Sequence, residues 1–122
     1  MKRILIIDDS KAMRMIVART IRQAGFGDCT IVEATNGAEG LAAVRAQTPD
    51  LVLCDWNMPE MSGYDLLEAL NADGKVPPFG FITSEGTLEI KVKALEAGAS
   101  FLIVKPFTVN ALQDAVRGMR AA

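Results

Sequence analysis

The chain has 122 residues, of which half are apolar and 23% are charged, as expected for one globular domain that buries its own core. Its formal net charge of −2 gives no general attraction to nucleic acid or to anionic lipid. No apolar run approaches the roughly 20 residues that span a bilayer, and the N-terminal apolar stretch is too short for a secretory signal. We therefore expect a cytoplasmic protein, with no nucleic acid or membrane among its partners.

The side-chain inventory excludes several kinds of catalytic site. The chain has no histidine, which removes the commonest general base and metal ligand and excludes any Ser–His or Cys–His mechanism. Its two cysteines, Cys29 and Cys54, are too few and too isolated for a disulfide framework or a zinc site. Cys54 lies in an apolar run, where a free thiol behaves as a small hydrophobic side chain. We expect both thiols to be reduced.

Short apolar runs alternate with amphipathic segments along the whole chain. Buried strands are predicted at residues 3–8, 30–34, 50–55, 79–83 and 100–105. The first amphipathic segment has a helical repeat that predicts one face toward the core and a stop at Gly25. The residues that make up this face are Met13, Ile16, Val17, Thr20, Ile21 and Ala24.

Further helices follow the second, third, fourth and fifth strands. Three of them have plausible N-cap residues, which are Asn36, Ser62 and Thr108. Residues 87–97 place Leu88, Val92 and Leu95 on one stripe that ends at Gly98, and the last helix carries the apolar residues Leu112, Ala115, Val116 and Met119. Five βα repeats with continuous apolar strands predict an α/β fold, a doubly wound (βα)5 parallel sheet of five strands with helices on both faces. We expect residues 1–122 to form this single domain.

In a doubly wound sheet, ligands bind beyond the carboxyl ends of the strands. The first strand delivers Asp8 and Asp9 to that edge, and the third delivers Asp55. The fourth strand ends in Thr83 and the fifth in Lys105. Three acids, a hydroxyl and a lysine are therefore predicted to converge on one rim.

Three carboxylates at one rim indicate a cation site. Two carboxylates about 4 Å apart repel by roughly 4 kcal/mol at an effective dielectric near 20, so a cluster must bind protons or a cation. Hard oxygen ligands without His or Cys favour Mg²⁺, which keeps several waters and shares phosphate oxygens. The alternative is that Asp8 and Asp9 only cap the helix that starts near residue 11. The turn "DDSKA" offers acids where a phosphate-binding loop would need glycines or hydroxyls, so a phosphate needs a bridging metal.

The lysine and the hydroxyl fit the same site. The stem of Lys105 can lie along apolar neighbours while its ammonium reaches the acids, and Pro106 restricts Lys105 to extended conformations. The isomer of the Lys105–Pro106 bond stays open. Thr83 could hydrogen-bond a phosphoryl oxygen, and Asp55 could take a phosphoryl group as an acyl phosphate. The alternatives are a merely solvated lysine and an ordinary threonine at a strand end.

The stretches "IIDDSKAMRMIV", "LVLCDWNMPEMSGYDLL", "FITSE" and "AGASFLIVKPF", with the spacing between them, resemble the receiver domain of two-component response regulators. The resemblance covers essentially the whole chain, and the order of its motifs is specific. The chain looks most like the stand-alone, CheY-like chemotaxis type, because "DWNMP" and "SKAMRMIV" follow that subgroup. The resemblance implies the flavodoxin-like arrangement of strands that CheY has.

The resemblance also implies roles for the acids. Asp55 would accept a phosphoryl group from a phosphohistidine on a sensor histidine kinase. Asp9 and Asp55 would ligate Mg²⁺ together with the backbone carbonyl of Asn57, and Asp8 would act mainly through water. A downstream target would read the phosphorylated state on the face made by the fourth helix, the fifth strand and the last helix. We expect a monomer.

Further roles follow for residues around the acceptor. Thr83 would hydrogen-bond the phosphoryl group and move with the loop after the fourth strand, and Lys105 would pair with the phosphate. Asn57 and Glu85 occupy the positions that tune hydrolysis of the acyl phosphate, and both match the CheY-like pattern, which predicts a short-lived phosphorylated state. Leu102 stands at the usually aromatic switch position, which puts the usual coupling between ring and threonine in doubt.

Two other functions use the same residues. A Mg²⁺-dependent phosphohydrolase would also form an aspartyl phosphate, but Asn57 cannot act as the general acid that its leaving group needs. A phosphate shuttle or sink in a phosphorelay would differ only in the protein that reads the phosphorylated state. The favoured interpretation is a signalling domain that catalyses only its own phosphorylation and dephosphorylation. We also expect the fluorescence of Trp56, next to the acceptor, to respond to Mg²⁺.

Overall fold

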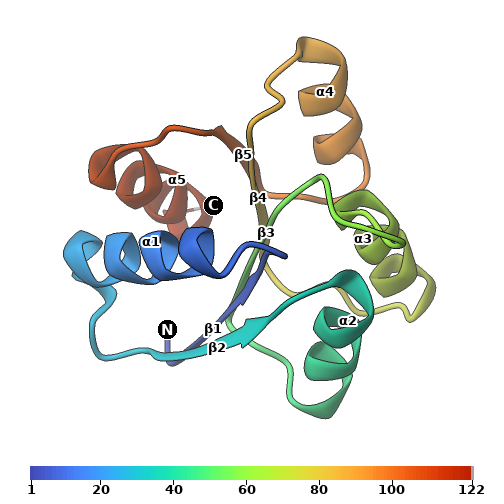
Figure 1. Cartoon of the computed structure of the whole chain (residues 1–122), viewed down its shortest axis with the longest axis horizontal. Coiled ribbons are helices and arrows are strands. Elements are labelled where there is room, and N and C mark those ends of the chain that lie inside the picture. The colour runs from blue at the N-terminus through green and yellow to red at the C-terminus, as the bar shows by residue number, and fades with distance from the viewer. Residues whose placement is uncertain (122) are drawn as a thin grey trace.

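A computed structural model describes residues 1–121, with side chains described as far as Met119. In this part of the chain, five parallel strands form one sheet with the order β2-β1-β3-β4-β5 (Figure 1). The strands are β1 (Arg3–Ile7), β2 (Thr30–Ala34), β3 (Leu51–Cys54), β4 (Phe79–Thr83) and β5 (Phe101–Val104). The predicted (βα)5 doubly wound sheet is confirmed, and the predicted strand ends differ from the observed ones by one residue at most.

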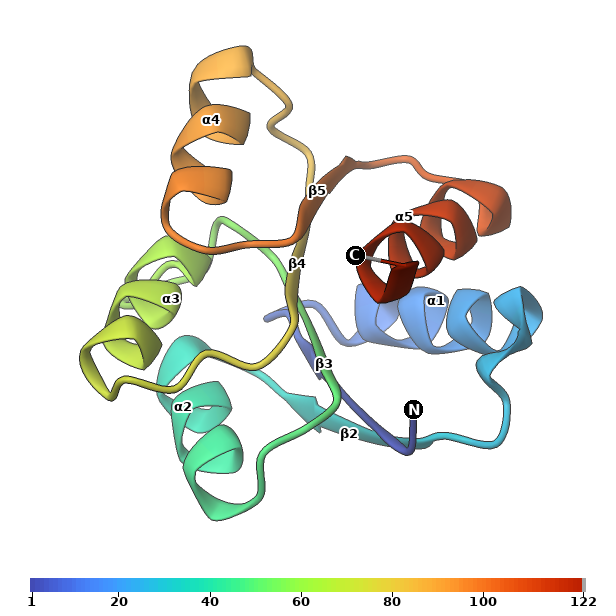
Figure 2. The same cartoon turned by 180° about the vertical axis from the view of Figure 1, so that it is seen from behind.

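Helices cover both faces of the sheet, as Figures 1 and 2 show from opposite sides. They are α1 (Lys11–Ile21), α2 (Gly37–Ala46), α3 (Gly63–Ala72), α4 (Leu88–Glu96) and α5 (Val109–Ala121), with a π-helical turn, η1 (Arg22–Phe26), after α1. Helices α1 and α5 bury Val17, Ile21, Leu112 and Val116 against one face. Helices α2, α3 and α4 cover the other face, where Phe79 and Phe81 of β4 lie fully buried. The three inner strands β1, β3 and β4 therefore have a covered core on both sides, which explains why their sequences are almost continuously apolar, whereas the edge strands β2 and β5 are only partly buried.

The helix starts match the predicted caps. The side chains of Asn36, Ser62 and Thr108 each accept a hydrogen bond from a backbone N–H in the first turn of α2, α3 and α5. Helix α1 begins after Ser10, whose hydroxyl accepts from the Met13 N–H at 3.2 Å. Because Ser10 caps α1, the alternative in which the preceding acids serve only as caps is wrong.

Apolar residues on two helices, α1 and α4, are more exposed than their helical spacing predicts. Ile16, predicted on the core face of α1, is 48% exposed, because only the narrower face with Val17 and Ile21 reaches the sheet. On α4 the stripe of Leu88, Val92 and Leu95 faces solvent, and Leu88 is 77% exposed. Ala94 is the buried residue of α4, and its small side chain lets the opposite side of this helix lie close to the sheet.

Two further observations answer questions left by the sequence. The Lys105–Pro106 peptide bond is cis. Within the described residues, no helix has the length and apolar character that would let it cross a membrane.

Candidate functional site

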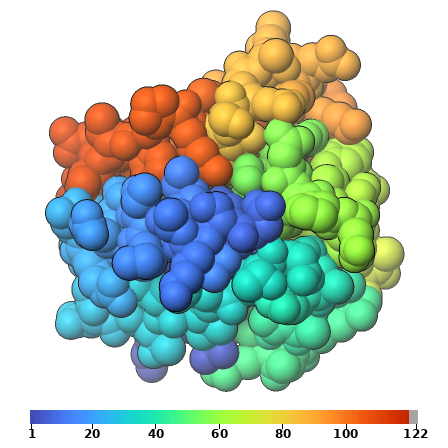
Figure 3. All heavy atoms as spheres, viewed as in Figure 1, coloured from blue at the N-terminus to red at the C-terminus, as the bar shows by residue number. Residues whose placement is uncertain are grey.

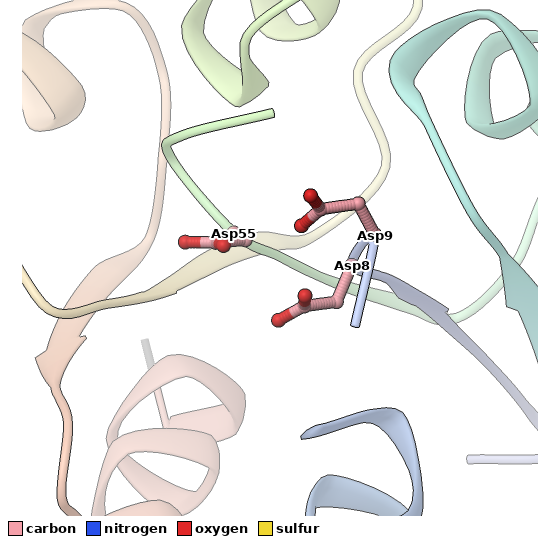
Figure 4. A group of neighbouring side chains, drawn as sticks. All are labelled: Asp8, Asp9 and Asp55. Atoms are coloured by element: carbon pink, nitrogen blue, oxygen red, sulfur yellow. The ribbon is translucent and has the colours of Figure 1, made fainter. Parts of the chain in front are cut away.

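The three acids meet where β1 and β3 end. Asp8 and Asp9 follow β1, Asp55 follows β3, and these two strands are neighbours in the sheet. Figure 4 shows the three side chains projecting to the same side of the two strand ends. One carboxylate oxygen from each lies within 4.8 Å of the others. In the space-filling view, the dark-blue segment after β1 meets the green segment after β3 at the surface (Figure 3).

Lys105 is the cation of this rim. Its Nζ lies 3.2 Å from Oδ2 of Asp8 and 3.6 Å from Oδ2 of Asp55, and its side chain is 16% exposed. The alternative of a merely solvated lysine is therefore wrong. This ammonium contacts two of the three clustered carboxylates, so the cluster keeps an excess of negative charge.

Asp8 and Asp9 have different environments. Asp8 is 4% exposed; its Oδ1 accepts from the Ser10 N–H at 2.9 Å, and its Oδ2 contacts Lys105. The backbone of Asp8 is also held, because its N–H donates to the Ala34 carbonyl at 3.2 Å. Asp9 is exposed to solvent. Asp8 is thus fixed by its neighbours, whereas Asp9 is accessible to an incoming cation.

The charges around the rim shift the pKa of Asp55, at the end of β3. Burial raises the pKa of Asp55, and the charge of Asp8 raises it further, while Lys105 and the N–H groups of Asn57 and Trp56 lower it. These opposing influences leave the pKa of Asp55 above its ordinary value. The Asp55 carboxylate is therefore incompletely compensated by the protein's own groups.

The donor set of the rim fits Mg²⁺. All three clustered side chains offer carboxylate oxygens, and the group contains no cysteine sulfur. Oxygen-only ligands at a partly exposed site, where an ion can keep some of its waters, are typical of Mg²⁺. A divalent cation would also relieve the excess negative charge that one lysine leaves.

Thr83, Glu85 and Asn57 form one hydrogen-bond network. Thr83 is fully buried at the end of β4, and its Oγ1 accepts from the Glu85 N–H at 3.2 Å. The Glu85 carboxylate accepts from Nδ2 of Asn57 at 2.9 Å, which joins the loops after β3 and β4. The Lys105 N–H donates to the Thr83 carbonyl at 2.7 Å. The sequence did not indicate that Asn57 and Glu85 touch each other.

Leu102 and Trp56 lie below the rim. Leu102 pairs in register with Phe81, so it lies on the same face of the sheet as Thr83, partly buried against the core that α4 covers. Trp56 is 9% exposed, with ring centroids 5.5 Å from Tyr64 and 4.9 Å from Phe81. The indole is therefore a core side chain adjacent to the acids.

Two residues of the site escaped the sequence interpretation. A Cβ added to Gly63 would overlap the carbonyl oxygen of Asp55, so the first residue of α3 must be glycine for the loop after β3 to close. Its position inside the quoted motif could have indicated such a close approach. Arg14 donates from Nη1 to the Asp8 carbonyl at 2.8 Å, and nothing in its local sequence distinguishes it from a surface arginine.

Comparisons with known proteins agree with this geometry. A family model described as response regulator receiver domain matches residues 4–117. Chemotaxis protein CheY1 of Helicobacter pylori strain J99 is 39% identical over 115 residues, which cover 92% of this chain and 91% of that protein. Chemotaxis protein CheY of Pseudomonas aeruginosa is 35% identical over 116 residues, covering 93% and 92%. The crystal structure of Vibrio cholerae chemotaxis protein CheY4 has a TM-score of 0.85 at 30% identity, covering 98% of each chain.

Proposed function

This chain is a member of the response regulator receiver domain family, and from this premise we propose that Asp55 accepts a phosphoryl group and thereby switches a signal. The observation that carries the proposal is the position of Asp55, a half-buried carboxylate at the end of β3 with Lys105 3.6 Å away and two more acids beside it. The three similar proteins reported above are named as chemotaxis proteins, which supports a chemotaxis-type role.

The transfer would proceed from a phosphohistidine on a sensor histidine kinase. A carboxylate oxygen of Asp55 attacks phosphorus, so that a new P–O bond forms while the P–N bond to the donor imidazole breaks. The imidazole nitrogen keeps the electron pair of that bond and takes up a proton. The Lys105 ammonium contacts an oxygen of the incoming group, and the Thr83 hydroxyl donates a hydrogen bond to another.

Asp9, Asp55 and the backbone carbonyl of Asn57 would hold Mg²⁺, with Asp8 acting through water. The bound ion would supply neutralisation of the charge that the phosphoryl oxygens and the carboxylates bring together. Asp8 is already held by Lys105 and by the Ser10 N–H, which suits an indirect role.

The phosphorylated state is proposed to be short-lived. The side chains of Asn57 and Glu85 join the loop that holds the acceptor to the loop after β4, where they can control how water reaches the acyl phosphate. Asn57 offers an amide where a phosphohydrolase would need a general acid, so turnover is limited to the domain's own phosphate.

A downstream protein is proposed to read the signal on α4, β5 and α5. Leu88, Val92 and Leu95 already leave an apolar stripe of α4 open to solvent, which suits a protein partner. Leu102, beneath this helix, would transmit the movement of Thr83 by repacking, with a smaller change of shape than an aromatic ring would give. We propose that the domain works in the cytoplasm as a monomer.

Incubation with Mg²⁺ and acetyl phosphate, followed by intact mass measurement, tests the chemistry. We expect the mass of one phosphoryl group to appear on the wild type and to be absent from D55N. The matched control is D50N, which removes the acid at the opposite end of the same strand and should be modified like the wild type. Modification of D55N, or none in any protein, would contradict the proposal.

A further inference from the structure

A nearly buried arginine connects the acid pair to the edge of the sheet. The guanidinium of Arg14, in α1, donates from Nη1 to the carbonyl oxygen of Asp8 at 2.8 Å. Its Nε donates to Oε1 of Glu33, in the edge strand β2, at 2.9 Å. The side chain of Arg14 is 11% exposed, whereas that of Glu33 is 49% exposed. The arginine, which belongs to α1, therefore links the turn that carries the acids to the edge strand β2.

The atom that Arg14 holds belongs to the backbone unit from which Asp9 begins. The carbonyl of Asp8 and the N–H of Asp9 belong to one planar peptide unit. Fixing the Asp8 oxygen therefore fixes the orientation of the bond from which Asp9 begins. The Ser10 N–H that donates to Oδ1 of Asp8 closes a ring that contains this peptide unit and restrains it from one side. Arg14 adds a second restraint, because it holds the carbonyl oxygen of the same unit from outside the ring.

We propose that Arg14 is a positioning residue for the cation site, aimed by Glu33, and that it presents the Asp9 carboxylate to the metal. The guanidinium suits this task because its rigid fork reaches two acceptors at once, which a lysine ammonium does not do in the same geometry. The inference deepens the proposed function and rests on it to the extent that the rim binds Mg²⁺.

Geometry and charge make opposite predictions for the loss of this arginine. If Arg14 acted only as a positive charge near three carboxylates, its removal would strengthen the attraction of the rim for a cation. If it positions the Asp8–Asp9 peptide, its removal must weaken cation binding. Loss of a residue that orients metal ligands typically costs 10- to 100-fold in metal affinity, so we expect about a tenfold rise in the Kd for Mg²⁺.

Isothermal titration calorimetry with MgCl₂ measures this Kd without any phosphoryl donor. We expect R14A and R14K to bind Mg²⁺ about tenfold more weakly than the wild type. E33A should weaken binding in the same direction, while E33Q, which keeps an oxygen for the Nε of Arg14, should stay within about twofold of the wild type. The control is R19A, which removes an exposed arginine from the same helix and should leave the Kd unchanged.

The possible outcomes distinguish a failure of the Arg14 positioning role from a failure of the proposed Mg²⁺ site. Absence of Mg²⁺ binding to the wild type would contradict the proposed metal site itself. Wild-type binding together with unchanged or tighter binding by R14A would overturn the positioning role alone, as would full affinity in R14K. Urea unfolding of each variant establishes that it is folded, and if R14A does not fold, R14K and the E33A and E33Q pair decide the question.

Discussion

The two ends of the sheet differ in how far their acidic side chains are compensated and in how much apolar surface they leave exposed. At the carboxyl end, Asp8, Asp9 and Asp55 cluster, and the Lys105 ammonium contacts only Asp8 and Asp55. Helix α4 and strand β5 also leave Leu88 and Val104 77% and 42% exposed there.

At the amino end, each acid with a defined contact is balanced. Asp50 accepts from the N–H groups of Lys2 and Arg3 at 2.7 and 2.9 Å. Asp73 receives two hydrogen bonds from the Arg45 guanidinium, at 2.9 and 3.0 Å. The amino end is arranged to hold the fold together, whereas the carboxyl end keeps charge and apolar surface that only other molecules can satisfy. Such a difference is expected where function is placed on one edge of a stable scaffold.

A large effect should come from adding one carbon atom at the carboxyl end. A Cβ on Gly63 would overlap the Asp55 carbonyl oxygen and the ring of Phe81, so we expect G63A to lose roughly 3 kcal/mol of unfolding free energy. The matched change is G118A in α5, where a Cβ meets nothing within 4 Å. It should gain up to about 1 kcal/mol, because alanine favours helix more than glycine does. Urea unfolding measures the free energy of unfolding of both variants. Equal changes in G63A and G118A would show that Gly63 is not required by close packing.

The fold was largely predictable because its signals are local. Buried parallel strands give continuous apolar runs, and caps such as Asn36 and Ser62 act through their own first turns, so both could be identified in the sequence. The exposure of Ile16 and of the α4 stripe was not predictable, because helical periodicity shows that a stripe exists and does not show which side meets the sheet. Which side of a helix is buried depends on how that helix packs against strands that are distant in the sequence.

For the site, the grouping of the acids was predictable from the sequence, whereas their contacts with other side chains were not. Strand order brings Asp8, Asp9 and Asp55 to one edge, so the general rule for doubly wound sheets was sufficient to group them. The contact between Arg14 and the Asp8 carbonyl depends on a side chain reaching a backbone atom and on a partner from β2. A sequence pattern contains neither piece of information.

Removing one acid from each end tests the contrast in charge. Without metal, D9N should gain about 0.5–1 kcal/mol of stability, since it relieves repulsion among the clustered carboxylates at a partly screened site. D50N should lose stability, because the N–H groups of Lys2 and Arg3 lose a charged acceptor. Thermal unfolding in EDTA compares the two variants.

Excess Mg²⁺ should then reverse the order of the wild type and D9N. A cation that binds only the folded state stabilises it by mass action, and D9N has lost one of the ligands. A rise in melting temperature that is equal in both proteins would show that Asp9 does not contribute to metal binding.

At acid pH, Asp50 at the amino end and Asp55 at the carboxyl end should change the free energy of unfolding in opposite directions. Hydrogen bonds from the N–H groups of Lys2 and Arg3 lower the pKa of Asp50, so its contribution is complete above the unfolded pKa of about 3.9 and disappears as pH falls through the lower folded value. Burial raises the pKa of Asp55, so protonation favours the folded state, and stability rises as pH falls through that raised value.

The two windows therefore lie on opposite sides of about pH 4. In metal-free buffer, D50N should flatten the loss of stability below this pH, and D55N should flatten the gain above it. Urea midpoints measured across the acid range check both slopes. If D50N and D55N changed the same window, the assignment of a balanced end and an unbalanced end would be wrong.

The smallest effect concerns the apolar surface of the carboxyl end. Leu88 is 77% exposed at the start of α4, so L88A removes little surface that folding withdraws from water and should change stability by less than about 0.5 kcal/mol. The same substitution at Leu112, which is fully buried in α5, should cost about 2–5 kcal/mol because it leaves a cavity. Urea unfolding compares the two. A cost above about 1.5 kcal/mol for L88A would mean that this leucine already packs within the domain, and the exposed stripe would then belong to the fold instead of being open to a partner.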